Sequence, residues 1–141
     1  MSSDTIAPVE IRPLAERVQE QRAGSVRLLM LDVAVPSVTS FTGSFAAYPD
    51  FKAGEELLQD LAVSLLDKGT RRRDRFEIAE LLENRGAQLH FTSDGLRVRF
   101  SGRSLTEDVE EVLLALAEQL REPLFDDAEF VKAKAQLAAR L

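Results

Sequence analysis

Apolar residues recur at helical spacing in four stretches of the chain after Gly54. The most apolar is Leu57–Thr70, where one stripe is formed by Leu57, Leu58, Leu61, Leu65 and Leu66. Lys68 suits the negative end of the helix dipole and Gly69 favours a left-handed cap, so we expect a buried helix that ends at Gly69. Because residues three and four apart are neighbours on a helix, an adjacent strip holds Asp60, Val63, Ser64 and Asp67.

Three further stretches have the pattern of helices, and each begins at a residue that can cap it. They are Arg75–Arg85 after Asp74, the stretch from Thr106 to Arg121, and the stretch after Asp126. In the first and the last, a glutamate stands three residues after the capping aspartate, which forms a capping box. The last stretch has its apolar positions at Phe130, Leu137 and Leu141.

Two patterns before and between the helices predict strands. Val26–Val35 is apolar on both faces, which favours a strand covered on both sides, and Val38–Tyr48 alternates apolar with polar residues and forms a hairpin with it. Ala87–Ser93 and Leu96–Ser101 flank Asp94-Gly95, a pair typical of a two-residue type I′ turn.

In this second hairpin a two-residue loop pairs Phe91 with Val98 and Leu89 with Phe100. These four apolar side chains then share one face of the hairpin. The other face holds His90, Thr92, Arg97 and Arg99.

The elements follow one another in the order ββααββαα, which predicts an α+β fold with one antiparallel or mixed sheet and helices packed on one face. Residues 1–25 are polar and contain two prolines, so we expect a leader or inter-domain linker there. The domain itself is expected to span residues 26–141.

Composition narrows the function classes. With 24 acidic and 18 basic residues the net charge is −6, which disfavours generic binding to nucleic acid or to an anionic membrane. The chain has no cysteine, so disulfides and thiolate chemistry are excluded. Apolar runs fall well short of the roughly 20 residues of a membrane span. We therefore expect a soluble protein, and both cytoplasm and periplasm stay open.

Several landmarks resemble the insulinase-like (M16) zinc peptidases. Ala53-Gly54, the leucine-rich helix, Lys68-Gly69-Thr70 and an arginine-rich turn follow one another as in the core of that family. The resemblance continues through Ile78-Ala79-Glu80, Gly86-Ala87, Leu105-Thr106-Glu107-Asp108-Val109 and Pro123-Leu124-Phe125-Asp126. The resemblance implies an M16-like domain of which this chain is a truncated piece, because the family's domain is longer.

In that family the helix carries an inverted zinc motif, His-x-x-Glu-His, just before Lys-Gly-Thr. Anchored on Lys68-Gly69-Thr70, the motif positions hold Asp60, Val63 and Ser64; anchored on Ala53-Gly54, they hold Leu57, Asp60 and Leu61. Neither register contains a histidine, and the last helix has no acid after Glu129 to supply the family's third ligand. His90 is the single histidine, whereas a zinc peptidase site usually takes at least two imidazoles. We expect no cofactor in this chain and zinc only in a catalytic partner.

Three sets of residues have alternative interpretations. Arg71, Arg72, Arg73 and Arg75 form either a solvated turn, which we favour, or an anion-binding patch. His90 is expected to be an exposed structural histidine. Asp60 and Ser64 can be an acid and a nucleophile, but no base is positioned beside them, so a polar strip that faces a chamber or a partner is favoured.

The resemblance implies a function. In this family an active and an inactive half close around a peptide, so the chain is expected to form part of the chamber wall and to dock to a catalytic half, in cis or as a separate subunit. The alternatives are a free-standing module that binds protein or peptide, and an enzyme with other chemistry. Self-association as a two-fold dimer is also predicted, through the apolar residues of the last helix or through the sheet edge left open by strands that the family's longer domain has.

Overall fold

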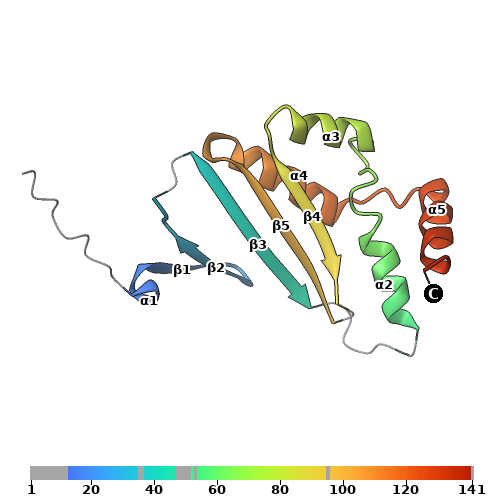
Figure 1. The fold of residues 1–141 in the computed structure, drawn as a ribbon, viewed down its shortest axis with the longest axis horizontal. Coiled ribbons are helices and arrows are strands. Elements are labelled where there is room, and N and C mark those ends of the chain that lie inside the picture. The colour runs from blue at the N-terminus through green and yellow to red at the C-terminus, as the bar shows by residue number, and fades with distance from the viewer. Residues whose placement is uncertain (1–12, 35–36, 47–51, 53, 95, 141) are drawn as a thin grey trace, which may run out of the picture. The chain divides into compact units, whose positions relative to one another are not determined.

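The computed structural model describes residues 13–34, 37–46, 52, 54–94 and 96–140. The chain divides into two compact units, Met1–Pro36 and Ser37–Leu141. Figure 1 shows the elements, which are α1 (Leu14–Arg17), β1 (Val18–Ala23), β2 (Val26–Leu31), β3 (Val38–Ala46), α2 (Glu55–Val63), α3 (Arg75–Glu83), β4 (Gln88–Ser93), β5 (Arg97–Leu105), the 3-10 turn η1 (Thr106–Asp108), α4 (Val109–Arg121) and α5 (Asp127–Ala138). No helix in the described part is long and apolar enough to cross a membrane.

The first unit is an antiparallel hairpin of β1 and β2. Pairing extends from Val18 opposite Leu31 to Ala23 opposite Val26, and Gly24 adopts a positive φ of 60° in the turn. The sequence pattern did not predict β1, which lies within the expected leader and pairs across the expected boundary at residue 26. Its residues are mostly polar, so only pairing with the apolar β2 marks it as a strand. The expected burial of β2 on both faces is wrong, because most of its side chains are exposed.

The second unit contains a three-stranded antiparallel sheet in the order β3-β5-β4. The fold class α+β is confirmed, and the order ββααββαα holds from β2 onward. Two details are wrong. The described strands form two sheets rather than one. The partner of β3 is β5 rather than β2, with pairs from Val38 opposite Leu105 to Ala46 opposite Arg97. In the sequence, β5 therefore follows its partner β3 only after the helices α2 and α3 and the strand β4.

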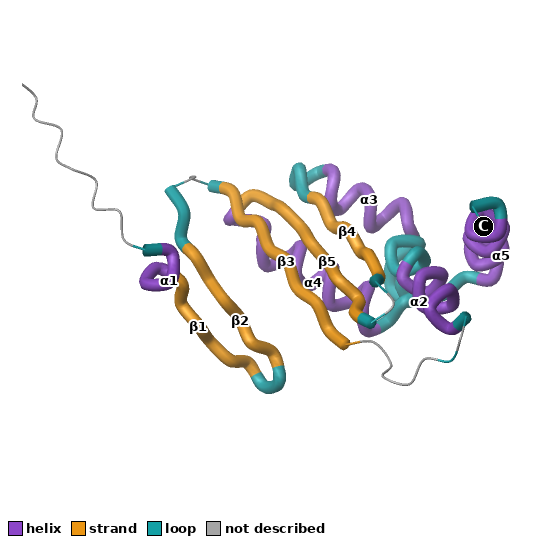
Figure 2. Tube along the Cα trace, turned by 60° about the horizontal axis from the view of Figure 1, so that its bottom comes forward, coloured by secondary structure: helices purple, strands orange, loops and turns teal. Residues whose placement is uncertain are grey.

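One face of this sheet forms the core, and α4 packs across it (Figures 1 and 2). From β5 and α4 the core takes Val98, Val112, Ala115 and Leu116, each at most 7% exposed. Leu89, Phe91 and Phe100 lie on the same face, as the alternation predicted. Helices are thus packed on one face, and the opposite face is exposed along its length.

The predicted register of the β4–β5 hairpin is wrong by two residues. Phe91 lies opposite Phe100, and Ser93 rather than Phe91 lies opposite Val98. The cause is local, since the Asp94 carboxylate accepts hydrogen bonds from the backbone N–H groups of Leu96 at 3.1 Å and Arg97 at 2.8 Å. A shift of two residues keeps every side chain on its predicted face. Gly95, on which the predicted turn type depends, lies outside the described residues.

The helix α2 ends at Val63 rather than at Gly69. Gly69 has a positive φ of 140°, a conformation that favours glycine, and it forms a short bridge to Asp74. After Val63 the backbone forms tighter turns of the 3-10 type, because the N–H groups of Leu65 and Leu66 donate hydrogen bonds to carbonyls only three residues back, those of Ala62 and Val63. Leu65 and Leu66 are still buried, so their apolar character reflects the core and not a longer helix.

The predicted capping residues behave in two ways. The Asp74–Glu77 capping box of α3 is confirmed, and the Asp126 side chain caps α5. Thr106 does not cap α4 directly, because the 3-10 turn intervenes and α4 begins at Val109. The Thr106 hydroxyl lies instead 3.0 Å from the hydroxyl of Thr39 on β3.

Candidate functional site

A groove lies between the end of α2, the edge strand β4 and the helix α5; we call it the α2–α5 groove. It consists of two adjoining hollows of about 720 and 350 Å³. Both are lined by Val63, Ser64, Phe91, Thr92, Ala133, Gln136 and Arg140. Hollows of this size accommodate small ligands or a few side chains of a peptide. The groove is the place where α2 and α5, which are far apart in the sequence, approach each other.

The three residues that the resemblance aligns with the zinc motif, in the register of Lys68-Gly69-Thr70, line this groove. Asp60 and Ser64 are exposed one helical turn apart, and Val63 is buried in a core cluster with Leu66 and Val98. The Ser64 hydroxyl donates a hydrogen bond of 2.7 Å to the backbone carbonyl of Leu61. This bond satisfies the end of the helix, and the hydroxyl proton is thereby directed to a backbone oxygen rather than to a general base.

The opposite wall carries Glu129, the last acid of α5. Its carboxylate accepts from the Lys132 ammonium at 2.9 Å and from Arg75 at 3.4 Å. The hydrogen bond from Lys132, with the positive fields of Lys132, Arg75 and Lys68, holds the pKa of Glu129 below its ordinary value. Glu129 is therefore an ionised partner of cations that the sequence pattern did not connect to it. Within the described ranges no group of three His, Cys, Asp or Glu side chains can hold a metal ion.

His90 lies on β4 at the rim of the same groove. Its side chain is exposed, and Ser101 of β5 lies opposite it. Next to it on the rim is Thr92. The expectation of an exposed histidine agrees with this position.

The arginine-rich turn is connected to two helices by ion pairs. Arg72 forms a bidentate pair with Glu122 at 3.1 and 3.0 Å, and Arg73 contacts Glu118 at 3.1 Å. Arg75 pairs with Glu129 as described, and its guanidinium carbon lies 4.6 Å from the centre of the Phe76 ring. Arg71 donates its backbone N–H to the Glu122 carbonyl.

These glutamates follow the turn by more than 40 residues, so no local signal in the sequence could have revealed them. The pairs neutralise three of the four charges of the proposed anion patch. The turn thus anchors the junction of α4 and α5.

Together, the sheet, the helix before Lys68-Gly69-Thr70 and the helices packed against them define an α+β domain of the insulinase type. Residues 61–141 match the family described as insulinase, peptidase family M16. The chain belongs to this family. The match covers α2 from Leu61 onward and all later elements.

Two solved structures share the fold. One is a peptidase M16 inactive domain from Pseudomonas fluorescens, with a TM-score of 0.75 and 23% identity over 86% of this chain. The other is a mutant of the ferredoxin protease FusC in complex with Arabidopsis ferredoxin, with a TM-score of 0.68 and 17% identity over 88% of this chain. This chain spans 30% of the first structure and 14% of the second. Comparison with curated proteins finds no match.

Proposed function

We propose that this chain is part of a non-catalytic M16 half domain, which contributes to the wall of a peptide-enclosing chamber and docks to a catalytic half. One observation carries the proposal. At the end of α2, where the family's zinc motif is expected, the groove presents Asp60, Val63 and Ser64. The facing carboxylate of Glu129 is held by two cations. The likeness of the fold of this chain to a peptidase M16 inactive domain supports the same assignment.

The groove suits enclosure of a peptide better than chemistry. Its walls combine apolar side chains such as Phe91 and Leu137 with polar ones. The polar groups are the hydroxyl of Thr92, the amide of Gln136 and the guanidinium of Arg140. Such a mixture binds an extended chain through many weak contacts. A zinc peptidase also needs two or more imidazoles at its metal, and this chain has one histidine. The zinc and the catalytic residues are therefore assigned to a partner half.

A metal and activity test checks this proposal. The chain alone is expected to keep no stoichiometric zinc after dialysis and to cleave no peptide. The catalytic half from the same source, identified by its His-x-x-Glu-His motif, is expected to co-elute with the chain and to cleave peptides faster in its presence. Tight one-to-one zinc with chelator-sensitive hydrolysis by the chain alone would contradict the proposal. Peptide binding without any association with a catalytic half would favour the free-standing binding module.

Self-association of the chain stays a prediction. On α5, Val131 is 65% and Phe130 36% exposed, and Leu137 is half-buried. Apolar surface of this kind tends to be covered by a partner, and a two-fold dimer is the commonest closed assembly. Sedimentation at micromolar concentration is expected to show a dimer, and Leu137→Glu is expected to shift it to monomer. A monomer in the unchanged chain would exclude this assembly.

A further inference from the structure

The three-stranded sheet has one face turned away from α4, which we call the outer face. Its side chains alternate with those of the core along each strand. The members of the outer face used below are all exposed: Ser40, Ser44, Gln88, Thr92, Arg97, Arg99, Ser101 and Arg103. These members are polar, and arginine is their only charged residue type, whereas the two ends of the same face carry the apolar residues Val38, Ala46 and Leu105.

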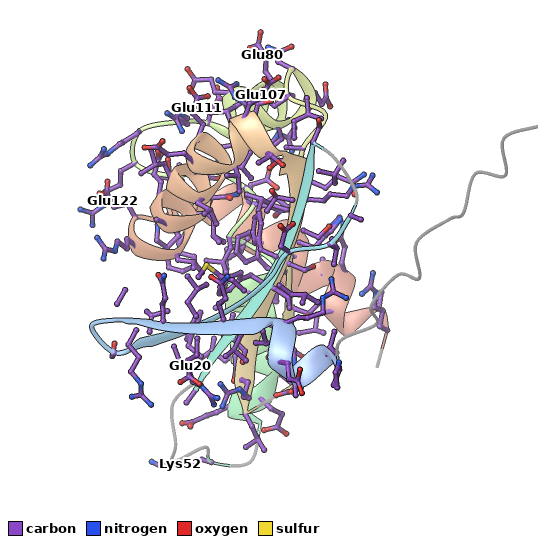
Figure 3. The ribbon with its side chains drawn as sticks, turned by 90° about the vertical axis from the view of Figure 1, so that its left-hand side faces the viewer. Glu20, Lys52, Glu80, Glu107, Glu111 and Glu122 are labelled. Carbon is purple, nitrogen blue, oxygen red and sulfur yellow. The ribbon has the colours of Figure 1, made fainter. Side chains whose placement is uncertain are left out.

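Charge is distributed unevenly over this domain. The strands β3, β4 and β5 contain no aspartate or glutamate, although the chain has 24 acidic residues. Many acidic residues lie on the helices, and Figure 3 shows Glu111 on α4 and Glu122 directly after it, on the far side of the sheet. An acidic chain thus carries a locally cationic sheet face, and long-range repulsion of anions is weakest there.

The outer face already binds one carboxylate of its own chain. Arg99 donates two hydrogen bonds to Asp94, at 3.1 and 2.8 Å, and this contact lowers the pKa of the Asp94 carboxyl. Arg97 donates instead to the Ser44 hydroxyl at 3.0 Å. Arg103 has no acidic partner in the part of the chain that the structure describes, and it lies between Ser40 and Gln88 on the neighbouring strands. Arg103 is therefore without an acidic partner among the described residues, and Arg97 is partly used by Ser44. The exposed Arg99 binds a carboxylate of another chain only in exchange for that of Asp94.

The spacing of the arginines fits an extended chain. Arg99 and Arg103 are four residues apart on the central strand β5, so their Cα atoms are separated by about 13 Å at the usual rise per residue. Carboxylates four residues apart on an extended polypeptide have the same spacing. A guanidinium can bind a carboxylate through two parallel hydrogen bonds. The hydroxyl and amide groups around Arg103 can bind the main chain of the same segment.

The geometry points to the outer face as a binding surface for an extended acidic segment of a polypeptide, with Arg99 and Arg103 as its two anchors. This surface is separate from the zinc-motif positions, so the inference does not depend on a catalytic half. Charge complementarity selects the occupant. Nucleic acid fits less well, because the chain is acidic overall and this face offers only three arginines to phosphates.

A binding experiment on the full chain tests the inference. The probe is a fluorescent peptide of alternating Glu and Ser, and the matched peptide has Gln in place of Glu. The acidic peptide is expected to bind, and its affinity is expected to fall when salt is raised to about 0.5 M, since exposed charges are then screened. The double variant Arg99→Ala with Arg103→Ala is expected to lose about tenfold in affinity, because two charge-assisted contacts are removed.

The control variant is Arg121→Ala, which removes an exposed arginine of α4 on the other side of the sheet. It is expected to leave the affinity within about twofold, because only nearby charges contribute at moderate salt. Thermal unfolding verifies that both variants remain folded. The inference is overturned by equal binding of the Gln peptide, by undiminished binding to the folded double variant, by absence of binding, or by tighter binding of a DNA oligonucleotide.

Discussion

Replacing Gly102 with alanine is expected to destabilise the domain by about 2 kcal/mol or more, because the new methyl group has no room. Gly102 lies on the core face of β5 directly opposite Phe41 of β3. A Cβ at this position would overlap the end of the Phe41 ring and would lie 2.9 Å from the Gln88 carbonyl oxygen. The ring could rotate away, but the carbonyl belongs to the backbone of β4, so the sheet itself would have to move.

The same arrangement is repeated two residues further along β3, at the next pair on the core face. Gly43 of β3 lies opposite Phe100 of β5, and the ring of Phe100 covers it. A glycine lets an aromatic side chain from the neighbouring strand lie flat over the backbone, which pins the register. At Gly43 the three atoms nearest to the missing Cβ all belong to the Phe100 ring, whereas at Gly102 one of them is a backbone oxygen, so Gly43→Ala is expected to cost less than Gly102→Ala.

Urea unfolding of the full chain measures these effects. Ser101→Ala is the matched control, because Ser101 is the neighbour of Gly102 on the exposed face, and a change of at most about 0.5 kcal/mol is expected. Adding Phe41→Leu to Gly102→Ala is expected to recover part of the loss if the ring is the obstacle. Unchanged stability of Gly102→Ala would show that the Phe41–Gly102 packing is not rigid.

The second large effect is expected at Gln119, which is 1% exposed on α4. Its Nε2 donates a hydrogen bond of 3.3 Å to the backbone carbonyl of Leu66, in the turn where α2 ends. Gln119→Ala removes this bond and leaves a cavity, so a loss of about 3 kcal/mol is expected. Gln119→Leu fills most of the space but leaves the Leu66 carbonyl without this donor, and about 1–2 kcal/mol is expected.

The difference between the two variants separates the packing of Gln119 from its hydrogen bond. Leu114→Ala is the control on the same helix, because Leu114 is 63% exposed and its truncation is expected to cost at most about 0.5 kcal/mol. Equal stability of all three variants in denaturant unfolding would contradict a role of Gln119 in holding the turn. A larger loss for the leucine variant than for the alanine variant would show that the site cannot accept an apolar side chain.

The order of the elements from β2 onward and the buried face of the β4–β5 hairpin were determined by the sequence alone. Alternation in β4 and β5 and the helical spacing of apolar residues between Thr106 and Arg121 depend on the geometry of one element, so neighbouring residues carry the whole signal. Capping by Asp74 and Asp126 is equally local, since each carboxylate binds N–H groups two and three residues away.

Tertiary structure decided what each element contacts. β3 pairs with β5 rather than with its neighbour β2, and Arg72, Arg73 and Arg75 find glutamates on α4 and α5. The end of α2 at Val63 depends on i→i−3 bonds and on the distant Gln119, although the apolar spacing predicts a helix up to Gly69.

The groove beside Ser64 exists only because α5 approaches α2. These contacts join residues separated by tens of positions, and their free energy depends on burial and on charge pairs that no local pattern contains. The sequence alone therefore determined the type and order of the elements from β2 onward and the buried face of the β4–β5 hairpin. Only the tertiary structure decided β1, the exposure of β2, the end of α2 and the partners of each element.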